Sequence, residues 1–290
     1  QADALRDDEA VGEAHRLLRE LIGQDFDIDS DGVPRLHRGT RADRIISVVD
    51  PEMRHGRKSQ HQRFDGFKLS AAVTNTPAPL ITAVEIAPAS AQDGPQAKHL
   101  IDAQPAHRRP SRVLGDTAYG TGPVRAELAD RDVEVLAPVF EGAVKPGRLG
   151  KREFRIDLDA GTVTCPAGQT AAIRTEPTGA RRARFAKAAC DVCALRERCV
   201  QPGSGAKAIL LAPDQELLIA ARQALDDPAT AEHLRRTRPR VERLLSLLAH
   251  RYNARKSRYI GTHKARLQAA WTAALVNLNP IGRQLSAQAA

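Results

Sequence analysis

The sequence has 290 residues and a formal net charge of +9, from 44 Lys and Arg against 35 Asp and Glu. At 42% hydrophobic residues it can bury one sizeable core and a second module, since single cores stop growing near about 250–300 residues. Neither a membrane span nor a signal peptide is expected, because no long apolar run occurs and residues 1–20 carry charges throughout. Four Cys are too few to staple a secreted scaffold of this length. These features predict a soluble cytosolic protein whose charged partner is a polyanion.

The first part of the chain is expected to be a helix followed by a linker. Val11, Leu18 and Ile22 stand at helical spacing, so residues 1–22 predict an amphipathic helix, and residues 23–43 form an acidic, turn-rich linker. The sequence begins at Gln1, and its only methionine is Met53, which predicts a fragment of a longer translation product.

Residues 44–139 alternate short β-rich runs with turns and helical stretches. This alternation predicts a mixed α/β core. The expected strands are 44–49, 67–74, 80–87, 112–115 and 133–137, and the expected helices are 93–103 and 123–130.

Residues 140–212 differ in character, because they hold all four Cys and many Gly, Pro and Arg, with short β-like pieces at 154–156 and 161–164. From residue 213 to 290 the chain is predicted to be helical. The expected helices are 214–225, 229–252 and 263–278, and the last of them is expected to bury Trp271 with Leu267, Leu275 and Leu278.

A strand-end acid is the first candidate functional residue. Asp116 directly follows the expected strand 112–115, within Gly-Asp-Thr-Ala-Tyr-Gly. Open α/β sheets bind ligands at the carboxyl ends of their strands, so its carboxylate is a candidate ligand. The alternative is that Asp116 only caps the following helix.

A second acid lies in a basic segment. Between Arg235 and Arg266 eleven residues are Lys or Arg, and Glu242 is the sole acid. A surface salt bridge would account for Glu242 but not for the surrounding bases. A carboxylate that holds a metal ion while neighbouring cations hold phosphates would account for both. Two Mg²⁺-type ions about 3.5–4 Å apart can drive phosphodiester chemistry, and they need carboxylates that converge from separate elements.

The cysteines form the third candidate site. Cys165, Cys190, Cys193 and Cys199 follow the pattern C-P-A-G…C-x₂-C-x₅-C. Four thiolates suit the tetrahedral preference of structural zinc, and a reducing cytosol disfavours disulfides. Buried or redox-responsive thiols and an iron–sulfur cluster remain alternatives. The basic stretch from Arg54 to Arg63 is open to two interpretations as well, a solvated loop or a phosphate contact.

An ordered set of motifs resembles the bacterial insertion-sequence transposases of the DDE class, specifically the IS1182-like group. The set spans roughly residues 40–280 and comprises Ser47-Val-Val-Asp-Pro-Glu-Met-Arg54, Asp65-Gly-Phe-Lys68, Leu114-Gly-Asp-Thr-Ala-Tyr-Gly120, Cys165-Pro-Ala-Gly168, Cys190-x-x-Cys-Ala-Leu-Arg-Glu-Arg-Cys199, Arg240-Val-Glu-Arg243 and Asn277-Leu.

The resemblance implies a ribonuclease-H-like mixed sheet with flanking helices, interrupted by a Cys-rich, zinc-ribbon-like insertion. By this reading residues 1–43 are a helix and linker, 44–139 the first part of the catalytic core, 140–212 the insertion and 213–290 its helical C-terminal part. The family's acids bind Mg²⁺ or Mn²⁺ for DNA strand cleavage and strand transfer, and two of them fall on Asp116 and Glu242. The residues expected to hold DNA phosphates are Arg238, Arg240, Arg243, Arg251, Arg255 and Lys256.

One departure concerns the first family acid. It usually lies upstream in an Asp-Gly-Thr or Asp-Ser-Thr turn, and no such motif occurs in this sequence. Asp50, in a family-like segment, is a candidate substitute ligand. The expectation is therefore an N-terminally truncated transposase, nucleoid-associated in a bacterial cytoplasm and acting on DNA as a homo-oligomer. The alternatives are a non-catalytic zinc-containing nucleic-acid-binding protein and an inactive remnant.

Overall fold

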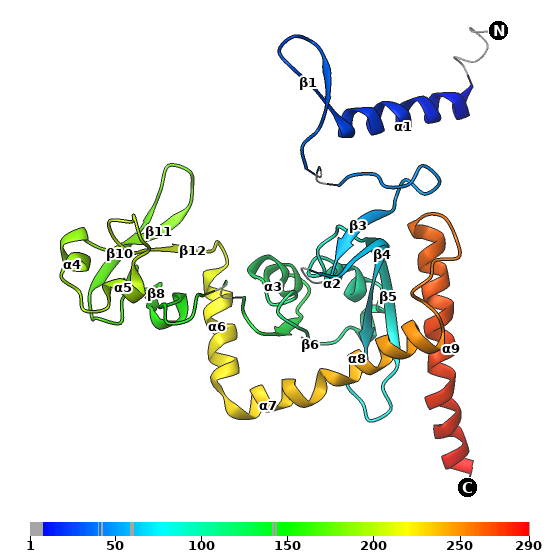
Figure 1. The fold of residues 1–290 in the computed structure, drawn as a ribbon. Coiled ribbons are helices and arrows are strands. Elements are labelled where there is room, and N and C mark those ends of the chain that lie inside the picture. The colour runs from blue at the N-terminus through cyan, green and yellow to red at the C-terminus, as the bar shows by residue number, and fades with distance from the viewer. Residues whose placement is uncertain are drawn as a thin grey trace. The chain divides into compact units, whose positions relative to one another are not determined.

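The computed structural model describes residues 8–289 except 40, 42, 59, 60, 141 and 143. The start of the predicted N-terminal helix, residues 1–7, lies outside the described residues. The chain forms two compact units: unit 1 comprises Gln1–Gln92 and Arg240–Ala290, and unit 2 comprises Asp93–Pro239 (Figure 1). None of the described helices has both the length and the hydropathy that a membrane crossing requires.

Unit 1 begins with a helix and a small hairpin. Helix α1 (Glu9–Asp25) starts at Asp8, whose carboxylate accepts hydrogen bonds from the N–H groups of Ala10 and Val11. Strands β1 (Phe26–Ile28) and β2 (Pro34–Leu36) then pair antiparallel. The predicted helix is confirmed over its described part, although none of its residues is buried.

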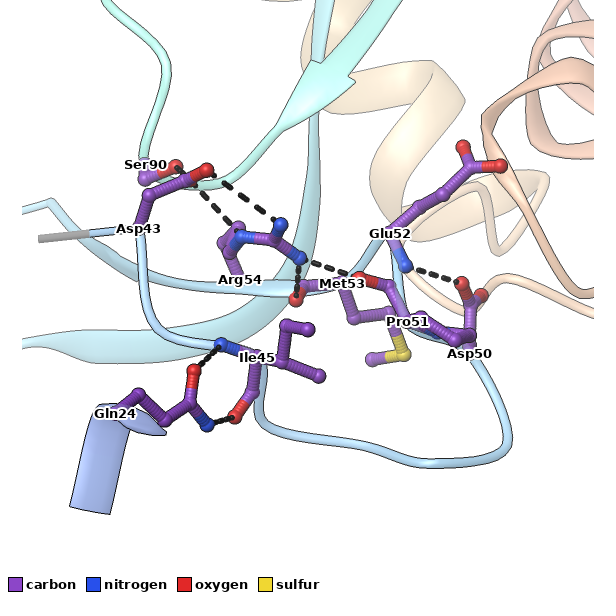
Figure 2. Close-up of polar contacts among 9 residues, drawn as sticks. All are labelled: Gln24, Asp43, Ile45, Asp50, Pro51, Glu52, Met53, Arg54 and Ser90. Atoms are coloured by element: carbon purple, nitrogen blue, oxygen red, sulfur yellow. Dashed lines mark hydrogen bonds and ion pairs between the residues drawn. The ribbon is translucent and has the colours of Figure 1, made fainter. Parts of the chain in front are cut away.

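The predicted strand 44–49 is wrong, and Figure 2 shows the reason. The side-chain amide of Gln24 satisfies the backbone of Ile45 in both directions: Nε2 donates to the carbonyl at 2.9 Å, and Oε1 accepts from the N–H at 3.0 Å. Ile45 itself is buried. A glutamine side chain thus replaces the hydrogen bonds that a neighbouring strand would supply.

The main sheet of unit 1 is a three-stranded antiparallel meander of β3 (Arg54–Arg57), β4 (Arg63–Val73) and β5 (Ile81–Pro88). Helix α9 (Thr262–Ala289) runs along β5, and α8 (Pro239–Ser246) packs on the same unit through Leu244. The core residues are Ile81, Ile86, Leu244, Leu248, Ala265, Ala269, Ala273 and Val276. Two hydrogen bonds between the Asn277 side chain and the backbone of Ile81 fix α9 to β5.

Helix α9 corrects two predictions. Trp271 is 67% exposed, and Leu267, Leu275 and Leu278 are also exposed, so this expected core face is wrong. The face that packs inward carries the small residues Ala265, Ala269 and Ala273, which let the helix backbone approach the sheet closely. The helix also continues beyond the expected end at 278, through Pro280.

Unit 2 contains a β–α–β segment. It comprises β6 (Arg112–Leu114), α3 (Gly122–Ala129) and β7 (Glu134–Leu136). The helix α2 (Gln96–Asp102) and the 3₁₀ turn η1 (Ala106–Arg108) precede it in the chain. β6 and β7 pair parallel, as expected for strands joined by a helix. Their core consists of Ala97, Ile101, Val124, Leu128, Val133, Val135 and Ala137.

The Cys-rich segment holds more β structure than the sequence predicted. Its five strands form one antiparallel sheet in the order β12-β11-β10-β9-β8. Phe154, Val163, Ala183, Phe185 and Ile209 form its core. The elements are η2 (Lys151–Glu153), β8 (Arg155–Asp157), β9 (Thr162–Thr164), β10 (Thr170–Thr175), β11 (Arg181–Arg184), α4 (Lys187–Asp191), α5 (Arg196–Cys199) and β12 (Ala208–Leu211).

The single helix predicted at 229–252 is divided. After α6 (Gln215–Asp226), the chain forms α7 (Pro228–Thr237), α8 and a π-helical turn, η3 (Leu247–Arg251). Pro239 accounts for the first division, because it has no N–H to donate to the preceding turn. The boundary between the two units falls directly after Pro239.

Candidate active site

Asp116 lies two residues after the end of β6, where the parallel strand pair ends. Its side chain is half-buried, and Oδ1 accepts a hydrogen bond from the N–H of Ala118 at 2.9 Å. Helix α3 begins later, with Thr121 as its N-cap. The interpretation of Asp116 as a helix cap is therefore wrong, since it orders only the turn that follows β6. This turn presents a carboxylate at the strand end, where α/β proteins hold their ligands.

The two glycines of the Asp116 motif are required by close packing. A Cβ on Gly120 would lie 1.9 Å from the carbonyl oxygen of Pro138, and one on Gly115 would lie 2.9 Å from Cβ of Tyr119. Real Cβ atoms essentially never lie within 3.0 Å of another heavy atom in this way. Gly120 therefore lets the turn bearing Asp116 pack tightly against the segment after β7, and Gly115 leaves room for Tyr119 within the turn.

Arg125 is a positioning residue that the sequence reasoning missed. This α3 side chain is only 6% exposed, and its guanidinium donates to three backbone carbonyls: Gly120 at 3.0 Å, and Val135 and Ala137 at 2.5 Å each. Burial lowers the pKa of Arg125, and the negative charge of Glu134 opposes that effect. Arg125 thus ties the end of the Asp116 turn to β7.

Glu242 occupies the first turn of α8 in unit 1, and its side chain is exposed. Leu244 and Leu248 fix this helical segment by packing into the unit 1 core. Arg240, two residues before Glu242, donates to the side-chain oxygen of Asn75 at 2.6 Å. The segment therefore holds Glu242 at the surface of unit 1, two positions after an arginine whose side chain is hydrogen-bonded.

The other predicted phosphate contacts lie along the same part of the chain. Arg238 follows α7 and is exposed, and Arg243 is exposed on α8. Arg251 ends the π-helical turn, and Arg255 and Lys256 lie in the loop before α9; all three are exposed. π-helical turns are often found at functional sites. The basic residues with exposed side chains are thus carried by a helix end, a π turn and a loop.

The side chain of Asp50 is buried and hydrogen-bonded to backbone groups. It is 5% exposed, Oδ1 accepts from the N–H of Glu52, and Oδ2 accepts from the N–H of Gly261 at 2.9 Å. Figure 2 shows the first of these contacts, in the loop that precedes β3. Oδ1 thus orders the loop itself, and Oδ2 connects the loop to the residue directly before α9, a role that needs no metal ion. Its role as a substitute ligand stays a prediction.

Glu52 caps α9, which the sequence reasoning also missed. Its Oε2 accepts from the N–H of Thr262 at 2.8 Å and from the Thr262 hydroxyl. These two hydrogen bonds hold the pKa of Glu52 below its usual value, and the bond from the hydroxyl has the larger effect. A carboxylate at a helix N-terminus satisfies an otherwise unpaired N–H and interacts favourably with the helix dipole.

Replacing Glu52 with Gln is expected to lower the free energy of unfolding by about 0.5–1 kcal/mol at pH 7, because the charged cap is lost. A carboxyl group with a lowered folded-state pKa stabilises the fold above its unfolded-state pKa and stops doing so as the pH falls through the folded-state value. The difference between the wild type and the variant should therefore shrink as the pH falls through the lowered folded-state pKa of Glu52. Urea denaturation followed by circular dichroism measures the difference, with the exposed Glu13→Gln as the control. Equal stability of wild type and Glu52→Gln at pH 7 would refute the cap.

The four cysteines lie in turns and short helices outside the strands of the Cys-rich sheet: Cys165 follows β9, Cys190 is in α4, Cys193 follows α4 and Cys199 ends α5. Cys165, Cys190 and Cys199 pack against its core, and all four are half-buried free thiols. Burial raises the pKa of the Cys199 thiol; Lys207 opposes this effect, and the other three cysteines add to it. The Cys199 thiol is thus near enough to the other three cysteines for their charges to act on it.

Two local contacts order the backbone around two of the sulfurs. The N–H of Leu195 donates to Sγ of Cys193 at 3.4 Å, and Gly168 closes the Cys165 turn with a φ of +80°. Four thiols have the chemistry that structural zinc requires. Within the described part of the chain, however, no three or more His, Cys, Asp and Glu side chains form a group arranged to hold a metal ion. The donor types fit zinc, whereas a closed ligand cage is not formed.

Asp116 belongs to unit 2 and Glu242 to unit 1. Each unit thus supplies one of the two predicted carboxylates, and neither contains the pair. Carboxylate oxygens are the donors that Mg²⁺ and Mn²⁺ prefer.

Comparison with known proteins finds a match to a family model over part of the chain. Residues 164–281, less than half of the chain, match the family model described as "Transposase DDE domain". The matched range includes all four cysteines and Glu242, and it excludes Asp50 and Asp116. No curated protein and no solved structure matches the chain. The match supports a DDE transposase, for which DNA is the implied partner.

Proposed function

We propose that this chain is the catalytic part of a DDE transposase of the IS1182-like bacterial insertion-sequence group, and that it cleaves and joins DNA strands. The observation that carries the proposal is the match of residues 164–281 to the transposase DDE domain. It covers the segment in which an exposed acid lies among exposed bases, the arrangement from which the sequence predicted phosphodiester chemistry.

The proposed catalytic core is ribonuclease-H-like. Such a core combines an antiparallel meander with parallel strands, and this chain has β3, β4 and β5 of the first kind and β6 and β7 of the second. We propose that Asp116, at the end of β6, and Glu242, on α8, belong to one site in the active protein. Asp50 is retained as a weaker candidate for the third acid.

When bound, Mg²⁺ or Mn²⁺ would activate the attacking oxygen and stabilise the leaving oxygen of the phosphodiester. Asp116 and Glu242 would hold the ions through their carboxylates. Arg125 would keep the Asp116 turn in place through its three carbonyl contacts. The six basic residues would hold DNA phosphates, and binding should weaken steeply with salt because each neutralised phosphate releases counterions.

The decisive experiment for this function is a nicking assay. Supercoiled plasmid carrying the genomic DNA that flanks the coding sequence is incubated with the purified chain and Mg²⁺, Mn²⁺, Ca²⁺ or EDTA. The proposal expects nicked circles with Mg²⁺ or Mn²⁺ and none with EDTA. DNA binding without nicking in any divalent ion would instead favour the non-catalytic nucleic-acid-binding protein.

We further propose that Cys165, Cys190, Cys193 and Cys199 bind a structural Zn²⁺. The supporting features are the common location of the thiols, the Leu195 N–H···S contact and the small core of the sheet that they adjoin. Protein purified without chelator should contain about one equivalent of zinc, and chelation should unfold the Cys-rich sheet, as seen by circular dichroism. Less than about 0.2 equivalents of zinc or iron would rule the site out.

A further inference from the structure

The loop of residues 252–261, which connects η3 to α9 in unit 1, exposes two neighbouring apolar side chains. Tyr259 is 53% exposed and Ile260 is 55% exposed. Among the described residues, the Tyr259 side chain has no hydrogen-bond partner and its ring contacts no other ring. A single exposed tyrosine is common on protein surfaces, and its significance here comes from the loop that holds it.

The backbone of this loop is fixed from α9. The side-chain amide of Gln268 reaches back to the loop on both sides of Ser257. Its Nε2 donates to the carbonyl of Lys256 at 2.9 Å, and its Oε1 accepts from the N–H of Arg258 at 2.9 Å. Both hydrogen bonds take up backbone groups that water would otherwise solvate, so the loop has a defined conformation although its side chains are exposed.

The two ends of the Tyr259 segment are fixed as well. The hydroxyl of Ser257 donates to the carbonyl of Tyr259 at 2.7 Å. Two residues after Tyr259, the N–H of Gly261 donates to Oδ2 of Asp50 at 2.9 Å. A ring that is exposed on an ordered backbone loses little conformational freedom when a ligand covers it, so binding there costs less entropy than on a mobile loop.

The surroundings of Tyr259 carry positive charge without compensation. Residues 243–290 contain eight Lys and Arg and no Asp or Glu. Two carboxylates of the β3 side contact this segment, those of Asp50 and Glu52, and both are hydrogen-bonded to backbone N–H groups. Within the part of the chain that the structure describes, four exposed cations close to Tyr259 in sequence form no ion pair and no side-chain hydrogen bond: Arg255, Lys256, Arg258 and Lys264.

An exposed ring among unpaired cations has the chemistry of a nucleic-acid strand site. Bases stack on aromatic side chains while the phosphates between them bind Lys and Arg. In a duplex the base faces are covered by their neighbours, so this ring can stack only on an unpaired base. An acidic peptide would bind the cations but offers the ring no base face. An anionic membrane could engage both features, but the loop lies within the segment that matches the transposase DDE domain, for which DNA is the partner.

We propose that Tyr259 stacks on an unpaired base of a DNA strand and that Arg255, Lys256 and Arg258 bind the adjacent phosphates. Ile260 would add apolar contact with the same base or with the next one. The loop would thus select single-stranded or locally melted DNA, which phosphate contacts alone do not distinguish from a duplex. This inference rests on the proposed function for the identity of the strand as DNA, but not on the proposed metal site.

The test compares two fluorescein-labelled probes of about 20 nucleotides, a thymidine single strand and a fully paired duplex. Their binding to the full chain is followed by anisotropy. Tyr259→Ala should bind the single strand about 5- to 100-fold more weakly and the duplex as the wild type does. Tyr259→Phe keeps the ring and should retain most of the affinity. Phe140→Ala is the matched control, because it removes an aromatic side chain that is 68% exposed outside this loop.

Salt dependence separates stacking from phosphate binding. Stacking releases no counterions, so Tyr259→Ala should leave unchanged the slope of log affinity against log salt for the single strand. Arg258→Ala removes one phosphate contact and should make that slope shallower by about 0.7. Circular dichroism checks that both variants are folded, as expected for side chains that are exposed.

Four results would overturn the proposal. The first is a wild type that binds no single strand, and the second is equal single-strand binding by the wild type and Tyr259→Ala. The third is an equal loss on both probes, which would show that Tyr259 only supports the loop. The fourth is binding of phosphatidylserine vesicles but of neither DNA probe, which would assign the loop to a membrane surface. Tyr259-dependent strand binding without nicking in any divalent ion would refute the catalytic proposal and leave this one standing.

Discussion

Replacing Glu242 with Gln is expected to lower metal-dependent DNA nicking by at least about 100-fold. The substitution keeps the size and exposure of the side chain and removes only the charge that would hold the ion. Stabilisation by a bound ion contributes several kcal/mol at the transition state, and each 1.36 kcal/mol corresponds to a factor of ten in rate. The nicking rate at saturating Mn²⁺ measures the effect.

The matched control for this change is Glu216→Gln, which removes an exposed carboxylate from α6 within the range that matches the transposase domain. Its nicking rate should equal that of the wild type. Asp116→Asn should lose as much activity as Glu242→Gln, and its amide oxygen can still accept the Ala118 N–H that orders the turn. If Glu242→Gln nicks DNA as fast as Glu216→Gln does, Glu242 is no metal ligand.

Replacing Arg125 with Met is expected to destabilise unit 2 by about 3–5 kcal/mol, the largest stability effect we foresee. Methionine fills much of the same space but donates no hydrogen bonds. The carbonyls of Gly120, Val135 and Ala137 would therefore lose their buried donor, and each unsatisfied group costs about 1–3 kcal/mol. Chemical denaturation followed by far-UV circular dichroism measures the loss.

Two variants sharpen the Arg125 experiment. Arg125→Lys keeps the charge but cannot reach three carbonyls at once, so it should lie between the wild type and Arg125→Met. Arg152→Met removes an exposed arginine that pairs with Asp226, and exposed pairs contribute only about 0–1 kcal/mol. Equal stability of Arg125→Met and Arg152→Met would show that the three carbonyls do not depend on Arg125.

Local pattern was enough to predict most elements of the fold. The β6, α3 and β7 segments follow from short apolar runs bounded by turn residues, and the predicted ranges differ from the observed ones by about one residue. The position of Asp116 at a strand end follows from the same pattern. The helical character after residue 213 is confirmed as well, and Pro239 shows where the expected single helix divides.

The errors come from side chains that act at a distance in sequence. The run at 44–49 has the composition of a strand. However, the side chain of Gln24, twenty-one residues before Ile45, forms the hydrogen bonds of the Ile45 backbone that a neighbouring strand would otherwise form. Periodicity revealed an apolar face on α9 but could not show that the alanine face would be the buried one. Arg125 resembles a surface residue by type; the one available signal is its place on α3 between Val124 and Leu128, both buried. The proposed pairing of Asp116 with Glu242 is likewise beyond local pattern, because 126 positions separate them.

The most direct test of a shared metal site is cleavage of the protein by bound iron. Fe²⁺ replaces Mg²⁺ in the purified chain, ascorbate and peroxide generate short-lived radicals at the ion, and the cut positions are read by mass spectrometry. Our account predicts cuts beside both Asp116 and Glu242, and loss of both sets in Asp116→Asn as well as in Glu242→Gln. Cuts that remain beside Glu242 when Asp116 is replaced would contradict it, because the two carboxylates would then not hold the same ion.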